Sequence, residues 1–136
     1  MNLRDVIPTA ENSSNFDVVP ESITEVGTTL ENLKAAVCGE TGASAKYAAF
    51  AEAARAQGYE QIARQFEATS AAEQIHIGLE AGVIAEIEPG YERPAAPEAE
   101  GIATDLNLIA GALGEIYETS DMYPSFIKVA QEEGNK

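Results

Sequence analysis

Two segments carry apolar residues at the spacing of an α-helix. Over 28–57, one stripe of a 3.6-residue period contains Leu30, Leu33, Val37, Glu40, Ser44, Tyr47, Ala51 and Ala54. Thr28 and Glu31 fit a capping box, in which each side chain satisfies the other residue's free backbone amide. Gly58 is a typical residue for ending a helix. The pattern therefore predicts a helix over 28–57.

A second helix is predicted over 59–84, directly after Gly58. Its inner side would hold Ile62, Phe66, Thr69, Glu73, His76 and either Leu79 or Glu80. Because so short a turn separates the two helices, they should pack as antiparallel neighbours.

The rest of the chain contains a linker and one more helix. Prolines and glycines between about 86 and 102 indicate a linker that is long enough to cross a helical bundle. A third helix is predicted over 104–133, ending before Gly134, with one stripe formed by Leu108, Ala112, Glu115, Glu118, Met122, Phe126 and Val129. Residues 1–26 lack periodicity and are interpreted as an irregular arm, which leaves 27–136 as the folded domain. No segment alternates with period 2, so the fold class is all-α.

The third helix repeats the first. Six identical pairs lie 75 positions apart: Thr29/Thr104, Asn32/Asn107, Leu33/Leu108, Ala35/Ala110, Gly39/Gly114 and Glu40/Glu115. Four later pairs lie 76 positions apart: Tyr47/Tyr123, Phe50/Phe126, Ala54/Ala130 and Gly58/Gly134. One extra residue therefore lies between Glu115 and Tyr123, and helices usually absorb such a residue as a π-bulge. Pro124 fits a broken ladder because it has no amide to donate. The second helix would have its copy beyond residue 136, so three of four helices are expected here.

Charge and composition narrow the function. The chain has 136 residues, 45% of them hydrophobic, which suits a single core. The chain has 8 Lys and Arg and 23 Asp and Glu, which gives a formal net charge of −15. This charge argues against nucleic-acid and anionic-membrane partners. No apolar run is long enough to span a membrane and the N-terminus lacks a signal peptide, so a cytoplasmic location is expected. The single cysteine, Cys38, is expected to be a buried small hydrophobe that points away from Glu40.

Ligand-type residues interrupt the stripes that should be buried. They are Glu40, Glu73, His76, Glu115 and Glu118. Burying several unpaired charges costs more than a domain can tolerate, so a bound metal ion is the simplest compensation. Glu73 and His76 are three residues apart on one helix face, and Glu-x-x-His with a facing Glu is the half-site of di-iron carboxylate bundles. Carboxylate and imidazole ligands suit iron or manganese better than structural zinc.

These residues, together with the stretch Gly114-Glu115-Ile116-Tyr117-Glu118-Thr119-Ser120-Asp121-Met122-Tyr123-Pro124, resemble the rubrerythrin family. The resemblance covers about residues 28–136. It implies a ferritin-like antiparallel bundle whose two irons reduce hydrogen peroxide, with manganese or zinc able to substitute. By it, the iron ligands are Glu40, Glu73, His76, Glu115 and Glu118, and Glu118 would exchange with His76 as the iron changes oxidation state. Tyr47 and Tyr123 match tyrosines whose hydroxyls orient ligand carboxylates.

Two departures from the family pattern are expected to matter. The second Glu-x-x-His of the family and its rubredoxin domain are both missing from the sequence. The chain is then expected to be either a fragment of a longer protein or dependent on another chain to complete its bundle. Electrons would come from an external, rubredoxin-type donor. We expect a homo-oligomer, a dimer in which the third helix can exchange between chains, because three amphipathic helices leave an apolar seam open. The alternatives are a ferritin-like protein that oxidises or stores iron, and a metal-free helical interaction module.

Overall fold

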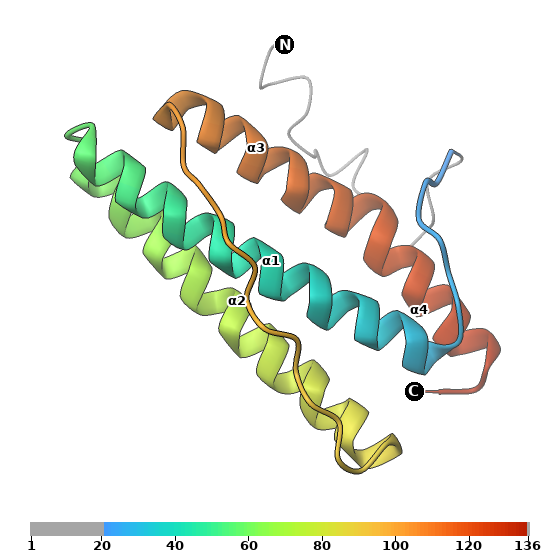
Figure 1. Ribbon diagram of the computed structural model, residues 1–136. Helices are drawn as coiled ribbons and strands as arrows, with labels where there is room; N and C mark the ends of the chain where they lie inside the picture. The colour runs from blue at the N-terminus through green and yellow to red at the C-terminus, as the bar shows by residue number, and fades with distance from the viewer. Residues whose placement is uncertain (1–20, 136) are drawn as a thin grey trace. The chain divides into compact units, whose positions relative to one another are not determined.

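The computed structural model describes residues 21–135 and shows only helices and irregular segments in that range. The helices are α1 (Thr29–Ala56), α2 (Glu60–Ile87), α3 (Thr104–Tyr117), the π-helix η2 (Glu118–Met122) and α4 (Tyr123–Glu132). Figure 1 shows α3, η2 and α4 as one continuous helix. The all-α class is confirmed, and so is the π-bulge, which lies between Glu115 and Tyr123 as the repeat predicts. Most of the predicted arm, residues 1–20, lies outside the described part.

Two compact units make up the described chain. Leu33–Leu108 form one, which we call the hairpin unit. The described residues before Leu33 and those from Ile109 onward form the other, which we call the arm unit. None of the described helices is both long and apolar enough to cross a membrane.

The ends of α1 follow the sequence signals. The amide of Thr28 donates to the Glu31 carboxylate (2.8 Å) and the amide of Glu31 donates to the Thr28 hydroxyl (3.3 Å), which confirms the capping box. At the other end, Gly58 has φ +87°, and the amide of Tyr59 donates to the Ala54 carbonyl (2.8 Å). A residue at this positive φ has no steric penalty only if it is glycine, so the stop is a glycine-dependent Schellman turn.

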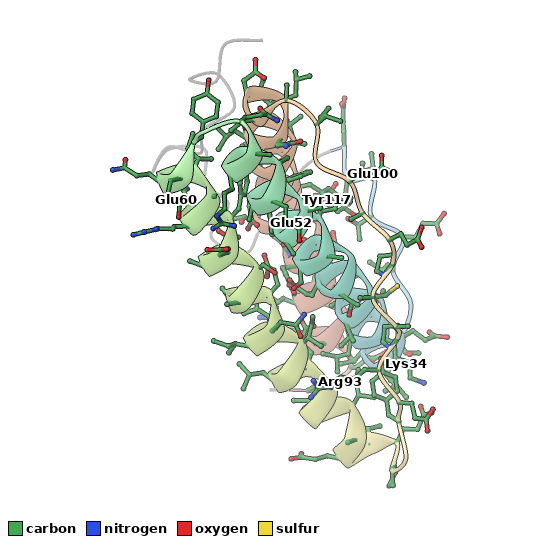
Figure 2. The ribbon with its side chains drawn as sticks, turned by 60° about the vertical axis from the view of Figure 1, so that its left-hand side comes forward. Lys34, Glu52, Glu60, Arg93, Glu100 and Tyr117 are labelled. Carbon is green, nitrogen blue, oxygen red and sulfur yellow. The ribbon has the colours of Figure 1, made fainter. Side chains whose placement is uncertain are left out.

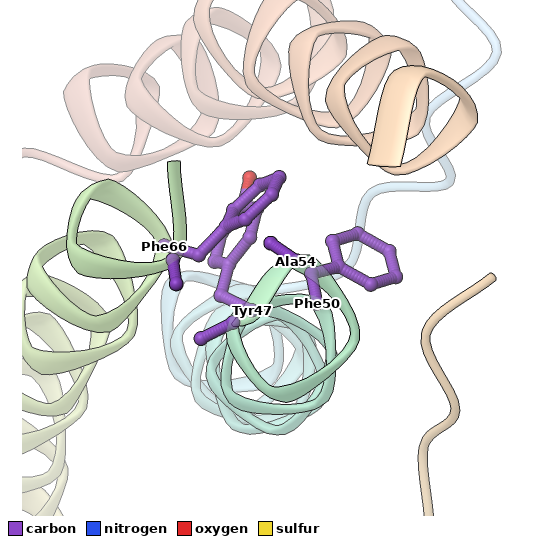
Figure 3. Close-up of a cluster of buried hydrophobic side chains, with 6 residues drawn as sticks. Tyr47, Phe50, Ala54 and Phe66 are labelled. Carbon is purple, nitrogen blue, oxygen red and sulfur yellow. The ribbon is translucent and has the colours of Figure 1, made fainter. Parts of the chain in front are cut away.

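An aromatic cluster joins α1 to α2 in the hairpin unit (Figure 3). The Tyr47 and Phe66 rings stack with centroids 6.1 Å apart, and Phe50 meets Phe66 edge-on at 5.4 Å. Ala54 and Ala63 fill the remaining space and are fully buried. Small alanines let the helices approach closely, so this cluster fixes α1 and α2 as the antiparallel pair that the short turn predicts.

A polar contact fixes the same pair one turn closer to the predicted metal ligands. The Ser70 hydroxyl donates to the Ser44 carbonyl (2.8 Å), and the Ser44 hydroxyl donates to the Ser70 carbonyl (3.0 Å). The side-chain amide of Gln74 donates to the Ser44 hydroxyl (2.8 Å). Reciprocal bonds of this kind form only at one axial register of two helices, so they set which residues of α1 face which residues of α2.

The predicted linker runs alongside α1 in an extended form (Figure 2, near Lys34, Arg93 and Glu100). Near its start, Glu88 forms an ion pair with Lys34. Near its end, the Ile102 carbonyl accepts a hydrogen bond from the Gln57 side chain (2.8 Å). Lys34 and Gln57 are about 35 Å apart along a helix at 1.5 Å per residue, a span that an extended chain of this length covers. The linker therefore crosses the full length of the hairpin, as its composition predicts.

The structure shows the burial of Cys38 and of the two alternatives on α2, Leu79 and Glu80. Cys38 is exposed, so the expectation of a buried hydrophobe is wrong. The reason is its position on α1, where it lies two residues before the buried Glu40 and hence on the opposite side of the helix. On α2, Leu79 is exposed and Glu80 is half-buried, because the buried stripe turns through Ile77 and Ala81.

Candidate metal centre

Three of the predicted ligands come together inside the hairpin unit. Ligand atoms of Glu40 on α1 and of Glu73 and His76 on α2 all lie within 4.8 Å of one another. His76 Nδ1 is 2.8 Å from Glu73 Oε2 and 3.7 Å from Glu40 Oε2. The Ser44–Ser70 contact explains this meeting, because Ser44 lies one turn after Glu40 and Ser70 lies one turn before Glu73.

Burial differs sharply among the three. Glu40 is 1% exposed and Glu73 is 3% exposed, so both carboxylates occupy the interior as predicted. The His76 side chain is 53% exposed, which corrects the expectation that it is buried. Its ring lies at the margin of the α1–α2 contact and reaches back to the carboxylates through Nδ1. The group therefore has a buried acidic side and an open imidazole side.

The donor set fits a metal ion. Ligand atoms bound to one ion at about 2.0–2.2 Å lie no more than about 4.4 Å apart, close to the spacing of this group. Carboxylate oxygens and an imidazole nitrogen are the ligands that iron and manganese accept. Arg55, near the end of α1, forms ion pairs with the surface acids Glu60 and Glu67 and is not paired with this group. A metal ion would supply the positive charge that two adjacent interior carboxylates call for.

The other two predicted ligands belong to the arm unit. Glu115 lies on α3 and is exposed, and Glu118 is the first residue of η2 and is half-buried. Full burial of this stripe was expected, so its interior placement is wrong for Glu115 and only partly right for Glu118. The three-residue group lies in the hairpin unit and does not test whether Glu115 and Glu118 bind metal.

The two predicted tyrosines have unlike surroundings. Tyr47 is buried in the aromatic cluster of the hairpin unit, two turns after Glu40. Tyr123 is half-buried at the start of α4, where its ring meets Phe126 edge-on at 6.5 Å. The core-packing role is thus visible for Tyr47.

Sequence reasoning did not single out Asp121, which is buried in η2. It accepts hydrogen bonds from the Ser22 hydroxyl, the Ile23 amide (2.9 Å) and the Thr24 hydroxyl (2.8 Å). Burial raises the pKa of its carboxyl, but these three donors and the Ser125 hydroxyl (3.4 Å) together outweigh burial and hold the pKa below its usual value. The only local signals were an acid beside the extra residue and Ser125 one turn later, because the other three donors lie almost a hundred positions away.

Comparisons with known proteins identify the family to which the sequence is similar. The family model described as rubrerythrin matches residues 31–136. Nigerythrin from Nitratidesulfovibrio vulgaris is 66% identical over 135 residues, which cover 99% of this chain and 67% of nigerythrin. Rubrerythrin from Porphyromonas gingivalis is 38% identical over 110 residues, which cover 79% of this chain and 54% of that protein.

Solved structures give the same result. The fully reduced, all-ferrous state of nigerythrin matches with a TM-score of 0.88 and 67% identity, over 95% of this chain and 64% of that one. The partially reduced state matches with a TM-score of 0.87. The expected ferritin-like fold is confirmed, and the chain spans between about half and two thirds of the length of these relatives. With a family match over most of its length, the two-helix ligand group and the π-helix in its third helix, this chain belongs to the rubrerythrin family.

Proposed function

We propose that this chain provides ligands for a di-iron site that reduces hydrogen peroxide to water. The observation that carries the proposal is the meeting of Glu40, Glu73 and His76 across two facing helices. The proposed ligand set adds Glu115 and Glu118 from the third helix. Family membership and the all-ferrous state named for nigerythrin support iron as the metal. Substitution by manganese or zinc stays a prediction.

The proposed ligands and the two tyrosines have different roles at the metal site. Glu40 and Glu73 bind the metal from the dry side, where their burial excludes water and strengthens the attraction between carboxylate and cation. His76 closes the group from the solvent side. When bound, two ferrous ions supply the two electrons that cleave the O–O bond, and two protons complete the conversion of peroxide to two waters. Tyr47 and Tyr123 are proposed to hold ligand carboxylates in place through their hydroxyls.

The electrons are proposed to come from a separate rubredoxin-type protein in the cytoplasm. The chain spans only part of its relatives, so the donor is assigned by family membership and not by a site described here. We assign the metal-binding domain to 27–136, after an arm of residues 1–26. The match to the family from residue 31 supports this division.

We also propose that the chain forms a homo-oligomer, in the simplest case a dimer. On α2, Ile75, Leu79, Val83 and Ile87 are exposed and follow one another at four-residue spacing. Such a stripe lies along one side of the helix, and each Å² of it that a second copy covers contributes about 25 cal/mol. Light scattering at micromolar concentration should return a multiple of the 14.4 kDa chain mass. A monomer mass would contradict this part of the proposal.

The metal site is tested with Glu73→Ala, with Glu86→Ala as the control because Glu86 is an exposed acid on the same helix. Anaerobic titration with ferrous iron should show at least tenfold weaker binding for Glu73→Ala and no change for Glu86→Ala. The variant should lose less stability without metal than with it, since removing one of two adjacent buried carboxylates relieves their repulsion. Peroxide consumption by the iron-loaded wild type, with a chemical reductant as donor, then measures the reaction.

Two other outcomes would replace the proposal. Wild-type protein that binds no iron or manganese would favour the metal-free helical interaction module, which the exposed stripe on α2 could serve. Iron that is bound and oxidised by dioxygen, with little peroxide turnover, would favour the ferritin-like storage function. Both alternatives stay open to these measurements.

A further inference from the structure

The third helix carries a polar attachment that neither metal binding nor core packing explains. Segment 22–24, which precedes α1, places three hydrogen-bond donors on the buried Asp121 carboxylate of η2. The Thr24 hydroxyl also lies 3.0 Å from the Tyr117 hydroxyl. Since Thr24 donates to Asp121, Tyr117 donates to Thr24. The segment is therefore attached at both flanks of Glu118.

Polar contacts hold this segment, since apolar packing contributes little. Ile23 is 80% exposed and Val26 is 51% exposed. A cavity of about 230 Å³ lies where Val26 faces Lys128 and Val129 of α4. With so little apolar surface buried, the hydrogen bonds to Asp121 are the main attachment of the segment to the helix.

The π-helix needs such an attachment because an extra residue does not by itself choose its place in a helix. The amide of Tyr123 donates to the Glu118 carbonyl, five residues back, and the Ser120 hydroxyl donates to the Ile116 carbonyl (2.6 Å). Shifting the bulge past Asp121 would turn that side chain by about 100° around the helix axis. Asp121 would then lose all three donors and remain buried without them.

We propose that segment 22–24 is a clasp that fixes the π-helix at Glu118–Met122 through Asp121, which makes Asp121 a positioning residue for the Glu118 carboxylate. The metal-related half of this inference rests on the proposed function, in which Glu118 is a ligand. In the first helix, the positions that correspond to Asp121 at the two repeat offsets are Ala45 and Lys46, and α1 is unbroken there. The bulge and the acid that fixes it thus occur together in one copy and are absent together from the other.

The test changes the clasp from both sides. Asp121→Asn keeps the shape of the side chain but removes the charge that the donors prefer. Ser22→Ala combined with Thr24→Val removes two donors and leaves the helix sequence intact, so it remains informative if Asp121→Asn folds poorly. Asp105→Asn is the control, because it makes the same chemical change at an exposed position of the same helix. Circular dichroism confirms that each variant folds.

Two readouts are needed. Amide hydrogen exchange of Glu118–Tyr123 should become at least tenfold faster in both clasp variants and stay unchanged in the control. Titration with Co²⁺ alone, followed by its visible absorption, should show an altered spectrum and about tenfold weaker binding in the clasp variants. A purely structural attachment would change the exchange rates but not the Co²⁺ spectrum.

Each remaining outcome is decisive. Unchanged exchange in both clasp variants would overturn the clasp. Faster exchange with an unaltered Co²⁺ spectrum and affinity would overturn the positioning role of Asp121. Wild-type protein that binds no Co²⁺ would contradict the proposed function and, with it, the positioning role, while the exchange rates would still show whether the clasp holds the π-helix.

Discussion

The first helix and its copy use the same residues in different ways. Tyr47 and Phe50 of α1 meet edge-on with centroids 6.2 Å apart, and their counterparts Tyr123 and Phe126 meet edge-on at 6.5 Å. The first pair is buried, because Phe66 of α2 covers it, whereas the second pair is half-exposed. The same local sequence therefore gives the same local geometry, while its energetic value depends on the helix that packs against it.

The first and third helices also end in the same way, and they differ in the number of residues before the tyrosine. Gly134 has φ +79°, and the amide of Asn135 donates to the Ala130 carbonyl (2.8 Å), just as Tyr59 donates to Ala54 after Gly58. Tyr123 follows Glu115 by eight positions in the third helix, whereas Tyr47 follows Glu40 by seven in the first. The third helix therefore absorbs its inserted residue locally, as a π-helix, and the tyrosine–phenylalanine pair and the glycine stop after it keep the local geometry found in α1.

The largest effect is expected from truncating a ring of the buried aromatic pair. Phe50→Ala should lower the free energy of unfolding by about 3–5 kcal/mol, because it empties a packed site. Phe126→Ala in the copy should cost about half as much, since the ring is half-exposed. Urea denaturation of both variants measures the difference. Equal costs would mean that the two pairs are packed alike.

A single deletion should make the copy resemble the first helix. Removing the exposed Thr119 restores the seven-position spacing between Glu115 and Tyr123 and should convert η2 into regular α-helix. Helix content should not fall, and the stability change should stay within about 2 kcal/mol, because a regular ladder offsets the lost contacts of Asp121. Hydrogen exchange and a structure of the variant give the outcome. A π-helix that persists elsewhere in α3 or α4 would show that another feature creates it.

The same substitution at the two glycine stops should lower the free energy of unfolding equally. Gly58→Ala and Gly134→Ala each place a Cβ at a positive φ and should each cost about 1 kcal/mol. Thermal or urea unfolding compares them directly. A clearly larger cost at one end would show that the two stops, although alike in backbone, are not equivalent in their surroundings.

The smallest effect is expected from lowering the pH. Hydrogen bonds lower the pKa of Asp121 despite its burial, and hydrogen bonds from the Thr29 hydroxyl and amide lower that of Glu133. A carboxyl with a folded-state pKa below its unfolded value stabilises the fold above the unfolded pKa and loses that contribution as pH falls through the folded value. Between pH 6 and 3, the arm unit should therefore lose amide protection more steeply in the wild type than in Asp121→Asn. Parallel curves would contradict the lowered pKa.

Periodicity located the three long helices, residue type located the capping box at Thr28 and the stop at Gly58, and the internal repeat located the extra residue before Tyr123. Periodicity also brought Glu40, Glu73 and His76 to one meeting point. These features depend on neighbours within about five residues, or on the fixed 3.6-residue turn, so the sequence states them directly. The extended path of the linker along α1 was foreseeable from its length but not in its contacts.

Only the tertiary structure decided which stripe residues are buried and what holds the π-helix. His76 shares α2 with the buried Glu73, yet it is exposed because the width of the α1–α2 contact sets the edge of the buried face. Asp121 meets Ser22, Ile23 and Thr24 across separations of 97 to 99 positions. A contact between residues so far apart leaves no periodic trace in either segment, since its geometry exists only after the chain has folded back on itself.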